Sequence, residues 1–337
     1  MSDHAKLLAA GREAVALASG VCRQVQRALE EVRAITKDDK SPVTVADFAS
    51  QAIVGRILRE RLGGGVVLVG EEDSAFLREP DHAAHLGATI DAVREVWDDA
   101  SESDVLSAID VGNGSPNHSG FWTLDPIDGT KGFLRGQQYA VSLAYIEHGE
   151  VVVGVLGCPN LPRDFSEPLD VPDDHGCLYF TMRGEGVWEV PVDDAADKPV
   201  HIKRLDHAEG EPICVCASVE KAHSNVSDTD RILELIGEAG EPVRLDSQAK
   251  YAVVARGQAD AYLRLPTRKD YVERIWDHAA GALIASEAGA SVTDIFGRQL
   301  DFSRGKGLEK NSGIVCAPPR VHGLMIGAIE QLGIGRG

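Results

Sequence analysis

Two aspartates stand three residues apart in the segment WTLDPIDGTKGF, residues 122–133. The proline between them fixes one backbone angle, and the glycine after them permits a sharp turn. A bent loop of this kind can present the carboxylates of Asp125 and Asp128 together with the carbonyl oxygen of Ile127. Because converging carboxylates repel each other and hard cations such as Mg²⁺ take oxygen ligands, the segment predicts a metal site. An aspartate-rich turn that binds no metal is the alternative.

Acidic residues from three further segments could join this site, because each lies at the end or start of an expected element. Glu71 and Glu72 follow the apolar strand of GVVLVGEED, and Asp47 ends the short run SPVTVAD. Asp277 begins the expected helix WDHAAGALIASEAG, where capping of that helix is the plain alternative. These acids form a carboxylate cage only if the fold brings them together, which their spacing alone does not show.

The elements that must position these acids change in type along the chain. Two helices are predicted at roughly 5–34 and 45–62. Between 120 and 193, paired apolar runs around glycine-containing turns predict hairpins and therefore an antiparallel sheet. Later strands alternate with helices, which is typical of a layered α/β domain. We therefore predict an N-terminal α+β domain at 1–205, carrying most metal ligands, and a smaller C-terminal α/β domain at 206–337.

Composition narrows the class of protein. The 337 residues are 43% hydrophobic, enough for a sizeable core, and they carry a formal net charge of -19. Such an acidic chain is a poor candidate for binding nucleic acid or anionic membranes. No window resembles a membrane span, and the N-terminus lacks the layout of a signal peptide. We expect a cytoplasmic protein with neither nucleic acid nor a membrane as partner.

Three motifs in order, GEED, DPIDGTKGF and WDHAAGALIASEAGA, resemble the inositol monophosphatase superfamily of Mg²⁺-dependent, lithium-sensitive phosphatases. The resemblance runs from Lys37 to Pro318. Within that superfamily, the stretches KSPVTVADFASQAIV, SVEKAHS and LDSQAKYAVVARGQADAYLRLP resemble the 3'(2'),5'-bisphosphate nucleotidase family. The fold that this implies is a layered α/β/α/β/α sandwich of the sugar-phosphatase type, with an antiparallel sheet in the first domain.

The resemblance also implies roles for individual residues. The expected ligands of two or three Mg²⁺ ions are the carboxylates of Glu71, Asp125, Asp128 and Asp277 and the carbonyl of Ile127. Asp47 and Thr130 would orient the attacking water and accept its proton. The backbone N–H groups of Gly129 and Thr130 would point at a phosphate oxygen.

A basic stretch in this acidic chain could receive a second phosphate. Residues 244–274 hold seven basic and four acidic side chains, a local charge of 7 − 4 = +3. A solvated helix surface is the plainer interpretation of any one of these cations. The resemblance singles out His223, Ser247, Lys250 and Arg264 as contacts to the nucleotide and its 5'-phosphate, and a guanidinium suits either task.

The activity implied is hydrolysis of adenosine 3',5'-bisphosphate to AMP and phosphate by a monomeric enzyme. A second expected substrate is 3'-phosphoadenylyl sulfate. Hydrolysis of inositol 1,4-bisphosphate or an inositol monophosphate is the closest alternative, since the same cage would serve it. A non-catalytic sensor of nucleotide or Mg²⁺ is the alternative from another class, against which the full set of acids argues.

Overall fold

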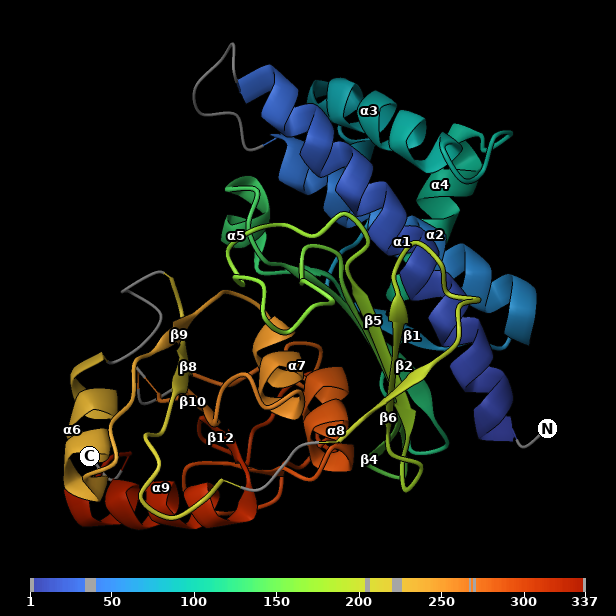
Figure 1. Ribbon diagram of the computed structural model, residues 1–337. Coiled ribbons are helices and arrows are strands. Elements are labelled where there is room, and N and C mark those ends of the chain that lie inside the picture. The colour runs from blue at the N-terminus through green and yellow to red at the C-terminus, as the bar shows by residue number, and fades with distance from the viewer. Residues whose placement is uncertain are drawn as a thin grey trace.

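The computed structural model describes residues 3–33, 41–203, 207–219, 226–266, 268 and 271–335. Over these residues two sheets alternate with three layers of helices (Figure 1). The expected α/β/α/β/α sandwich is therefore confirmed. Among the described helices, none combines the length and apolar character that crossing a membrane requires.

The first sheet holds the loops that carry most of the acids. Its seven strands, in spatial as well as chain order, are β1 (Leu68–Gly70), β2 (Phe121–Asp128), β3 (Ala140–Glu147), β4 (Glu150–Cys158), β5 (Cys177–Met182), β6 (Val187–Pro191) and β7 (Val200–Ile202). All neighbouring pairs are antiparallel except β1 and β2, which are parallel. The antiparallel sheet predicted for residues 120–193 is confirmed, and β1 adds one parallel neighbour at its edge, because a long helical connection lets the chain return in the same direction.

That connection contains short helices: η1 (Phe76–Arg78), η2 (Pro80–His82), α3 (Ala83–Arg94), α4 (Glu102–Ile109) and η3 (Asp110–Gly112). The two aspartates of the opening motif do not lie in a free loop as expected. They lie within β2, whose pairing with β3 shifts register between Asp125 and Asp128. The shift follows from Pro126, which cannot donate a ladder hydrogen bond, and it lets both carboxylates leave the end of one strand.

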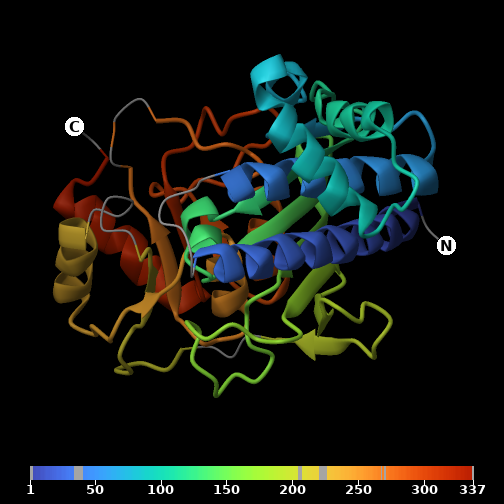
Figure 2. The ribbon, with the colours of Figure 1, turned by 90° about the horizontal axis from the view of Figure 1, so that it is seen from above.

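Two long helices, α1 (Asp3–Arg33) and α2 (Ser41–Leu62), cover one face of this sheet. Figure 2 shows them side by side across the strands. Small and β-branched residues such as Ala14, Ala18 and Ile53 are fully buried there and form the first core. Because α2 crosses the sheet beside β2, residues on one of its faces reach the acids.

The second sheet has the strand order β11-β12-β10-β8-β9. Its strands are β8 (Val215–Ala217), β9 (Val243–Arg244), β10 (Ala261–Arg264), β11 (Ser291–Thr293) and β12 (Ile314–Ala317). The helices of this half are α6 (Val226–Ile236), α7 (Ala249–Ala255), α8 (Ala279–Glu287) and α9 (Pro319–Leu332). Helices α7 and α8 lie between the two sheets, and α6 and α9 cover the outer face (Figure 1).

The second core joins residues of both sheets through α7 and α8, including Ala144, Tyr251 and Cys316. The third core lies between the second sheet and α6 and α9. The change from one sheet to the other falls between Ile202 and Val215, around the expected boundary. Because the middle core belongs to both halves, the division into domains 1–205 and 206–337 stays a prediction.

Candidate active site

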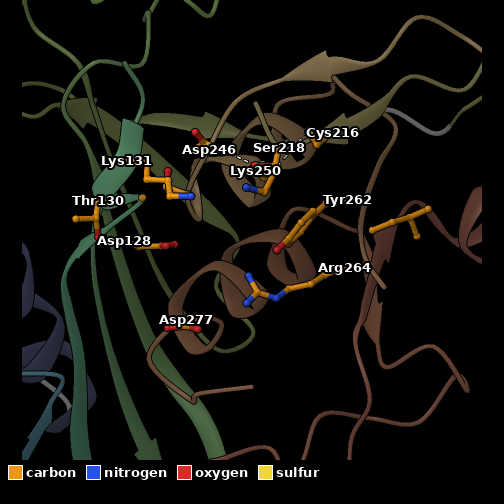
Figure 3. A pocket seen from close by; sticks show the side chains of 13 residues that line it. Asp128, Thr130, Lys131, Cys216, Ser218, Asp246, Lys250, Tyr262, Arg264 and Asp277 are labelled. Atoms are coloured by element: carbon orange, nitrogen blue, oxygen red, sulfur yellow. Dashed lines mark hydrogen bonds between the residues drawn. The ribbon is translucent and has the colours of Figure 1, made fainter. Parts of the chain in front are cut away.

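A cavity of about 330 Å³ opens between the first sheet and the second sheet. Its walls come from the end of β2 with the start of α5 (Thr130–Leu134), from the segment before α7, and from β8 and β10. Asp277, two residues before α8, completes them. The lining residues are Asp128, Gly129, Thr130, Lys131, Cys216, Ser218, Asp246, Ser247, Lys250, Tyr262, Leu263, Arg264 and Asp277. The close-up shows Asp128, Asp277, Lys250 and Arg264 around one space (Figure 3).

Five carboxylates from four distant segments meet beside this cavity. Burial raises the pKa of Asp125 well above its usual range, and the charges of Glu71, Asp128, Asp277 and Asp47 raise it further. The carboxyl of Glu71 is also hydrogen-bonded to that of Asp125, and Asp125 accepts the backbone N–H of Ile127 at 3.1 Å. The five acids that the sequence proposed for the cage and for proton transfer are therefore neighbours.

The other acids of the cluster are perturbed in the same direction. Desolvation and the charges of Glu72 and Asp128 raise the pKa of Glu71 to about 7, although Glu71 keeps contact with solvent. Burial and the charge of Asp128 raise the pKa of Asp277 to about 8. Burial, Glu72 and Glu71 raise the pKa of Asp47. Acids that raise one another's pKa form a site that hard cations would stabilise, so this donor set fits Mg²⁺.

The melting temperature of the protein in EDTA is expected to fall as pH rises from about 5 to about 8. A carboxyl with a higher pKa when folded binds more protons in the folded state, so the free energy of unfolding decreases above the unfolded pKa near 4. The decrease should continue through the values for Glu71, about 7, and Asp277, about 8. Millimolar Mg²⁺ should flatten this slope and stabilise most at the alkaline end.

Thermal melts at several pH values, with EDTA or with Mg²⁺, test this expectation. Ca²⁺-free buffers of constant ionic strength separate specific binding from screening. A melting temperature in EDTA that is level or rising over this pH range would contradict the cluster of raised carboxyls.

Helix α2 supports two acid-bearing segments, those of Pro126 and Glu72, through hydrogen bonds. Ser50 donates its hydroxyl to the carbonyl of Pro126 at 3.0 Å. Gln51 donates to the carbonyls of Glu72 and Ile109 and accepts the N–H of Glu72 at 3.2 Å. Together with Asp47 these residues occupy positions i, i+3 and i+4, which share one helix face. Sequence analysis missed Ser50 and Gln51, because their partners lie 21 to 76 positions away and a shared helix face alone does not reveal them.

The opposite wall of the cavity is basic. Lys250 is 8% exposed, and its ammonium lies 5.3 Å from the ring centre of Tyr262. Burial lowers the pKa of Lys250, and the charges of Asp128 and Asp246 act in the opposite direction. Arg264 donates from Nε to Glu273 at 2.8 Å, so one edge of its guanidinium is fixed. The cavity thus has carboxylates on one side and two held cations on the other.

Glu273 links Arg264 to the start of α8. Its second carboxylate oxygen lies 3.2 Å from Nε2 of His278, whose Nδ1 lies 2.9 Å from the hydroxyl of Tyr251. Because both ring nitrogens of His278 have protein partners, the structure favours a structural role for it, although Glu273, Asp277 and His278 are close enough to hold an ion. His278, not Asp277, is the N-cap residue of α8, which leaves the carboxylate of Asp277 to the site.

Asp246 connects the basic wall to the DGTKGF segment. It accepts from the hydroxyl of Ser218 at 2.6 Å and from the N–H of Val219 at 3.2 Å, and it pairs with Arg135. These interactions lower the pKa of Asp246 despite its burial. Sequence analysis missed Asp246 and Arg135, because an ion pair 111 positions apart has no local pattern.

Five of the six expected substrate contacts lie in the cavity. Gly129, Thr130, Ser247, Lys250 and Arg264 all line the cavity. His223 lies outside the described residues. The apolar side chain of Ile127 is buried in the core, and its backbone carbonyl is the group that could serve as an oxygen ligand.

Fold and site together define a layered phosphatase-type protein, and comparison with known proteins agrees. The chain belongs to the inositol monophosphatase family, whose model matches residues 6–333. Enzymes of this family are metal-dependent.

The similar curated proteins carry one kind of name. A 3'(2'),5'-bisphosphate nucleotidase of Schizosaccharomyces pombe is 41% identical, with 92% of this chain and 90% of the relative covered. A protein of the same name from Oryza sativa is 39% identical over 98% of this chain and 95% of its own. Among solved structures, an inositol monophosphatase from Anabaena matches with a TM-score of 0.63 at 20% identity, covering 98% and 97% of the two chains. This last likeness shows the fold alone.

Proposed function

We propose that this protein is a Mg²⁺-dependent 3'(2'),5'-bisphosphate nucleotidase that hydrolyses adenosine 3',5'-bisphosphate to AMP and phosphate. The observation that carries the proposal is the cavity whose acidic wall, with Asp128 and Asp277, faces the held cations Lys250 and Arg264. The names of relatives 38–41% identical over most of the chain support it. The same arrangement would accept 3'-phosphoadenylyl sulfate, which also has a 3'-phosphate and a second anionic group.

The acidic wall suits the reacting 3'-phosphate. Two or three Mg²⁺ ions, held by Glu71, Asp125, Asp128, Asp277 and the carbonyl of Ile127, would supply charge neutralisation at the phosphate and at the leaving oxygen. Asp47, a neighbour of Glu71 in the acid cluster, accepts the proton of the attacking water. The hydroxyl of Thr130 holds that water in line with the ester oxygen. Water adds to phosphorus, the P–O3' bond breaks, and the 3'-oxygen leaves as an alkoxide that takes a proton from solvent water, to which Asp47 then returns its own proton.

The basic wall suits the second phosphate. Lys250 is the buried cation of the cavity's inner side, and a phosphate would replace the weak 3.5 Å contact of its ammonium with the carbonyl of Leu245. Arg264, which Glu273 holds at Nε and the Tyr271 hydroxyl contacts at Nη2, adds a guanidinium to the same wall. Ser247 adds a hydroxyl at the same rim. We further propose that the enzyme is a lithium-sensitive, cytoplasmic monomer, in which Li⁺ replaces one Mg²⁺.

Phosphate release from adenosine 3',5'-bisphosphate, AMP and inositol 1,4-bisphosphate, measured side by side with Mg²⁺, tests the activity. We expect strong preference for the first compound and almost none for AMP, whose only phosphate occupies the basic wall. Preference for the inositol ester would keep the acid cluster and reject the nucleotide pocket. No release from any compound would reject the enzyme and favour the sensor.

Arg264→Ala is expected to lower kcat/KM for adenosine 3',5'-bisphosphate by about 10- to 100-fold, the loss of one charge-assisted hydrogen bond. Hydrolysis of inositol 1-phosphate, which lacks a second phosphate, should change less than about threefold. The variant leaves Glu273 with His278 as a partner, so the fold should survive. Equal losses on both substrates would count against Arg264 as a nucleotide contact.

A further inference from the structure

Gln248 is a buried amide between two residues of the basic wall, and its side chain contacts three other segments. It is 2% exposed. Its Nε2 donates to the carbonyl of Trp276 at 2.8 Å. Its Oε1 accepts from the hydroxyl of Ser142 at 3.1 Å and from the N–H of Gly281 at 3.3 Å. One side chain thus joins the segment before α7 to β3 and to both sides of the α8 start.

The main chain of Gln248 contacts the acidic wall directly. Its N–H donates to Oδ2 of Asp128 at 2.6 Å, a short hydrogen bond to a carboxyl group. The side chain meanwhile holds the carbonyl of Trp276, the residue before Asp277. A single residue therefore orients one expected metal ligand and the backbone next to another.

The preceding residue, Ser247, adopts a backbone φ of 71°, in the left-handed region that non-glycine residues rarely occupy. Its hydroxyl accepts the N–H of Ala249 at 3.1 Å, which holds this turn. The turn aims the N–H of Gln248 at Asp128, while Ser247 and Lys250 line the cavity. Left-handed non-glycine residues persist where the surroundings determine them, and they cluster at ligand sites. The position of this turn is thus tied to both walls.

We propose that Gln248 is a positioning residue that couples occupancy of the second-phosphate subsite at Ser247 and Lys250 to the placement of Asp128 and Asp277. The inference rests on the proposed function and extends it. A phosphate on Ser247 and Lys250 orders the turn, and the turn orders the two carboxylates through Gln248. Binding free energy from the part of the substrate that does not react then appears as a higher kcat.

The kinetic test compares adenosine 3',5'-bisphosphate with 3'-AMP, which lacks the second phosphate. In the wild type we expect kcat on the bisphosphate to exceed kcat on 3'-AMP by at least about 30-fold. Gln248→Met keeps the side-chain length and removes the amide, and it should reduce this ratio to about threefold or less by lowering kcat on the bisphosphate alone. KM for the bisphosphate should change less. Equal losses of kcat on both substrates would overturn the proposal, because a merely structural role lowers both.

A second test measures AMP binding and does not require turnover. By linkage, if Mg²⁺ tightens AMP binding, AMP tightens Mg²⁺ binding by the same factor. Calorimetric titrations of AMP with and without Mg²⁺ should give a factor of at least about five in the wild type and less than about two in Gln248→Met. An unchanged factor in the variant would overturn the coupling.

Two further variants keep the test decisive. Gln26→Met is a matched control: Gln26 is 4% exposed, and its amide bonds Phe133 and Asn160, neither of which lines the cavity. The Gln26→Met variant should be less stable and leave the substrate ratio unchanged.

If Gln248→Met does not fold, Ser142→Ala removes one hydrogen bond to the amide and should reduce the ratio by about two- to fivefold. An unchanged ratio in Ser142→Ala would overturn the proposal. A wild type inactive on the bisphosphate would reject the proposed function instead, and the AMP titrations would still decide the coupling.

Discussion

An Asp128→Asn variant is expected to lose at least about 1,000-fold in kcat and yet to melt at a higher temperature than the wild type in EDTA at about pH 8. The loss follows from removing a carboxylate at the centre of the cluster, where several kcal/mol of charge stabilisation is at stake. The gain follows because the charge of Asp128 raises the pKa of Glu71, Asp125 and Asp277. An amide relieves that repulsion and can still accept the N–H of Gln248.

Asp294→Asn provides the opposite signature. Asp294 is fully buried, but its carboxylate accepts the N–H groups of Phe296 and Arg298, each at 2.9 Å, in a turn after β11. An asparagine there should cost about 1–3 kcal/mol of stability and leave kcat unchanged. Circular dichroism melts and initial rates on both variants separate a functional carboxylate from a structural one. An Asp128→Asn enzyme that keeps a tenth of its activity would remove the metal cage from the mechanism.

The acids of the site could be predicted from sequence because charge next to an apolar run is a local signal. Asp128 ends β2, Asp125 lies three residues before it, and Glu71 follows β1; the structure places all three in one cluster. Their local conformation was less predictable. The motif was expected to form a free loop, and instead Pro126 shifts the register inside β2, which depends on the pairing with β3.

The residues that align the acids could not be predicted, because their effect depends on distant partners. Gln51 and Gln248 are uncharged and lie in ordinary helical sequence. Gln51 bonds backbone groups 21 and 58 positions away, and Gln248 bonds backbone groups 28 and 33 positions away. Nothing in their own segments distinguishes them from solvated glutamines. Asp246 and Arg135 are charged, but their ion pair joins positions 111 residues apart, which no local pattern reveals.

Gly129→Ala is expected to have the second largest effect. Gly129 has a φ of 89°, where an L-residue costs about 1–2 kcal/mol. A methyl group built there would also lie 2.7 Å from Cβ of Ser247, closer than real side-chain carbons approach. Overpacking of this kind adds about 1–3 kcal/mol and must push the DGT segment away from the turn at Ser247. We expect kcat/KM to fall by at least about 100-fold, because both walls of the cavity meet at this contact.

Gly63→Ala separates the close approach from the backbone strain. Gly63 follows α2 with a φ of 90°, nearly that of Gly129, and a methyl group there would meet nothing within 4 Å. The same backbone strain should lower the stability of this variant by about 1–2 kcal/mol, and the variant should keep full activity. The excess destabilisation of Gly129→Ala over Gly63→Ala, measured by urea unfolding, then reports the contact between the two walls. If the two alanine variants matched in both stability and kcat/KM, the contact between Gly129 and Ser247 would have no part in holding the site.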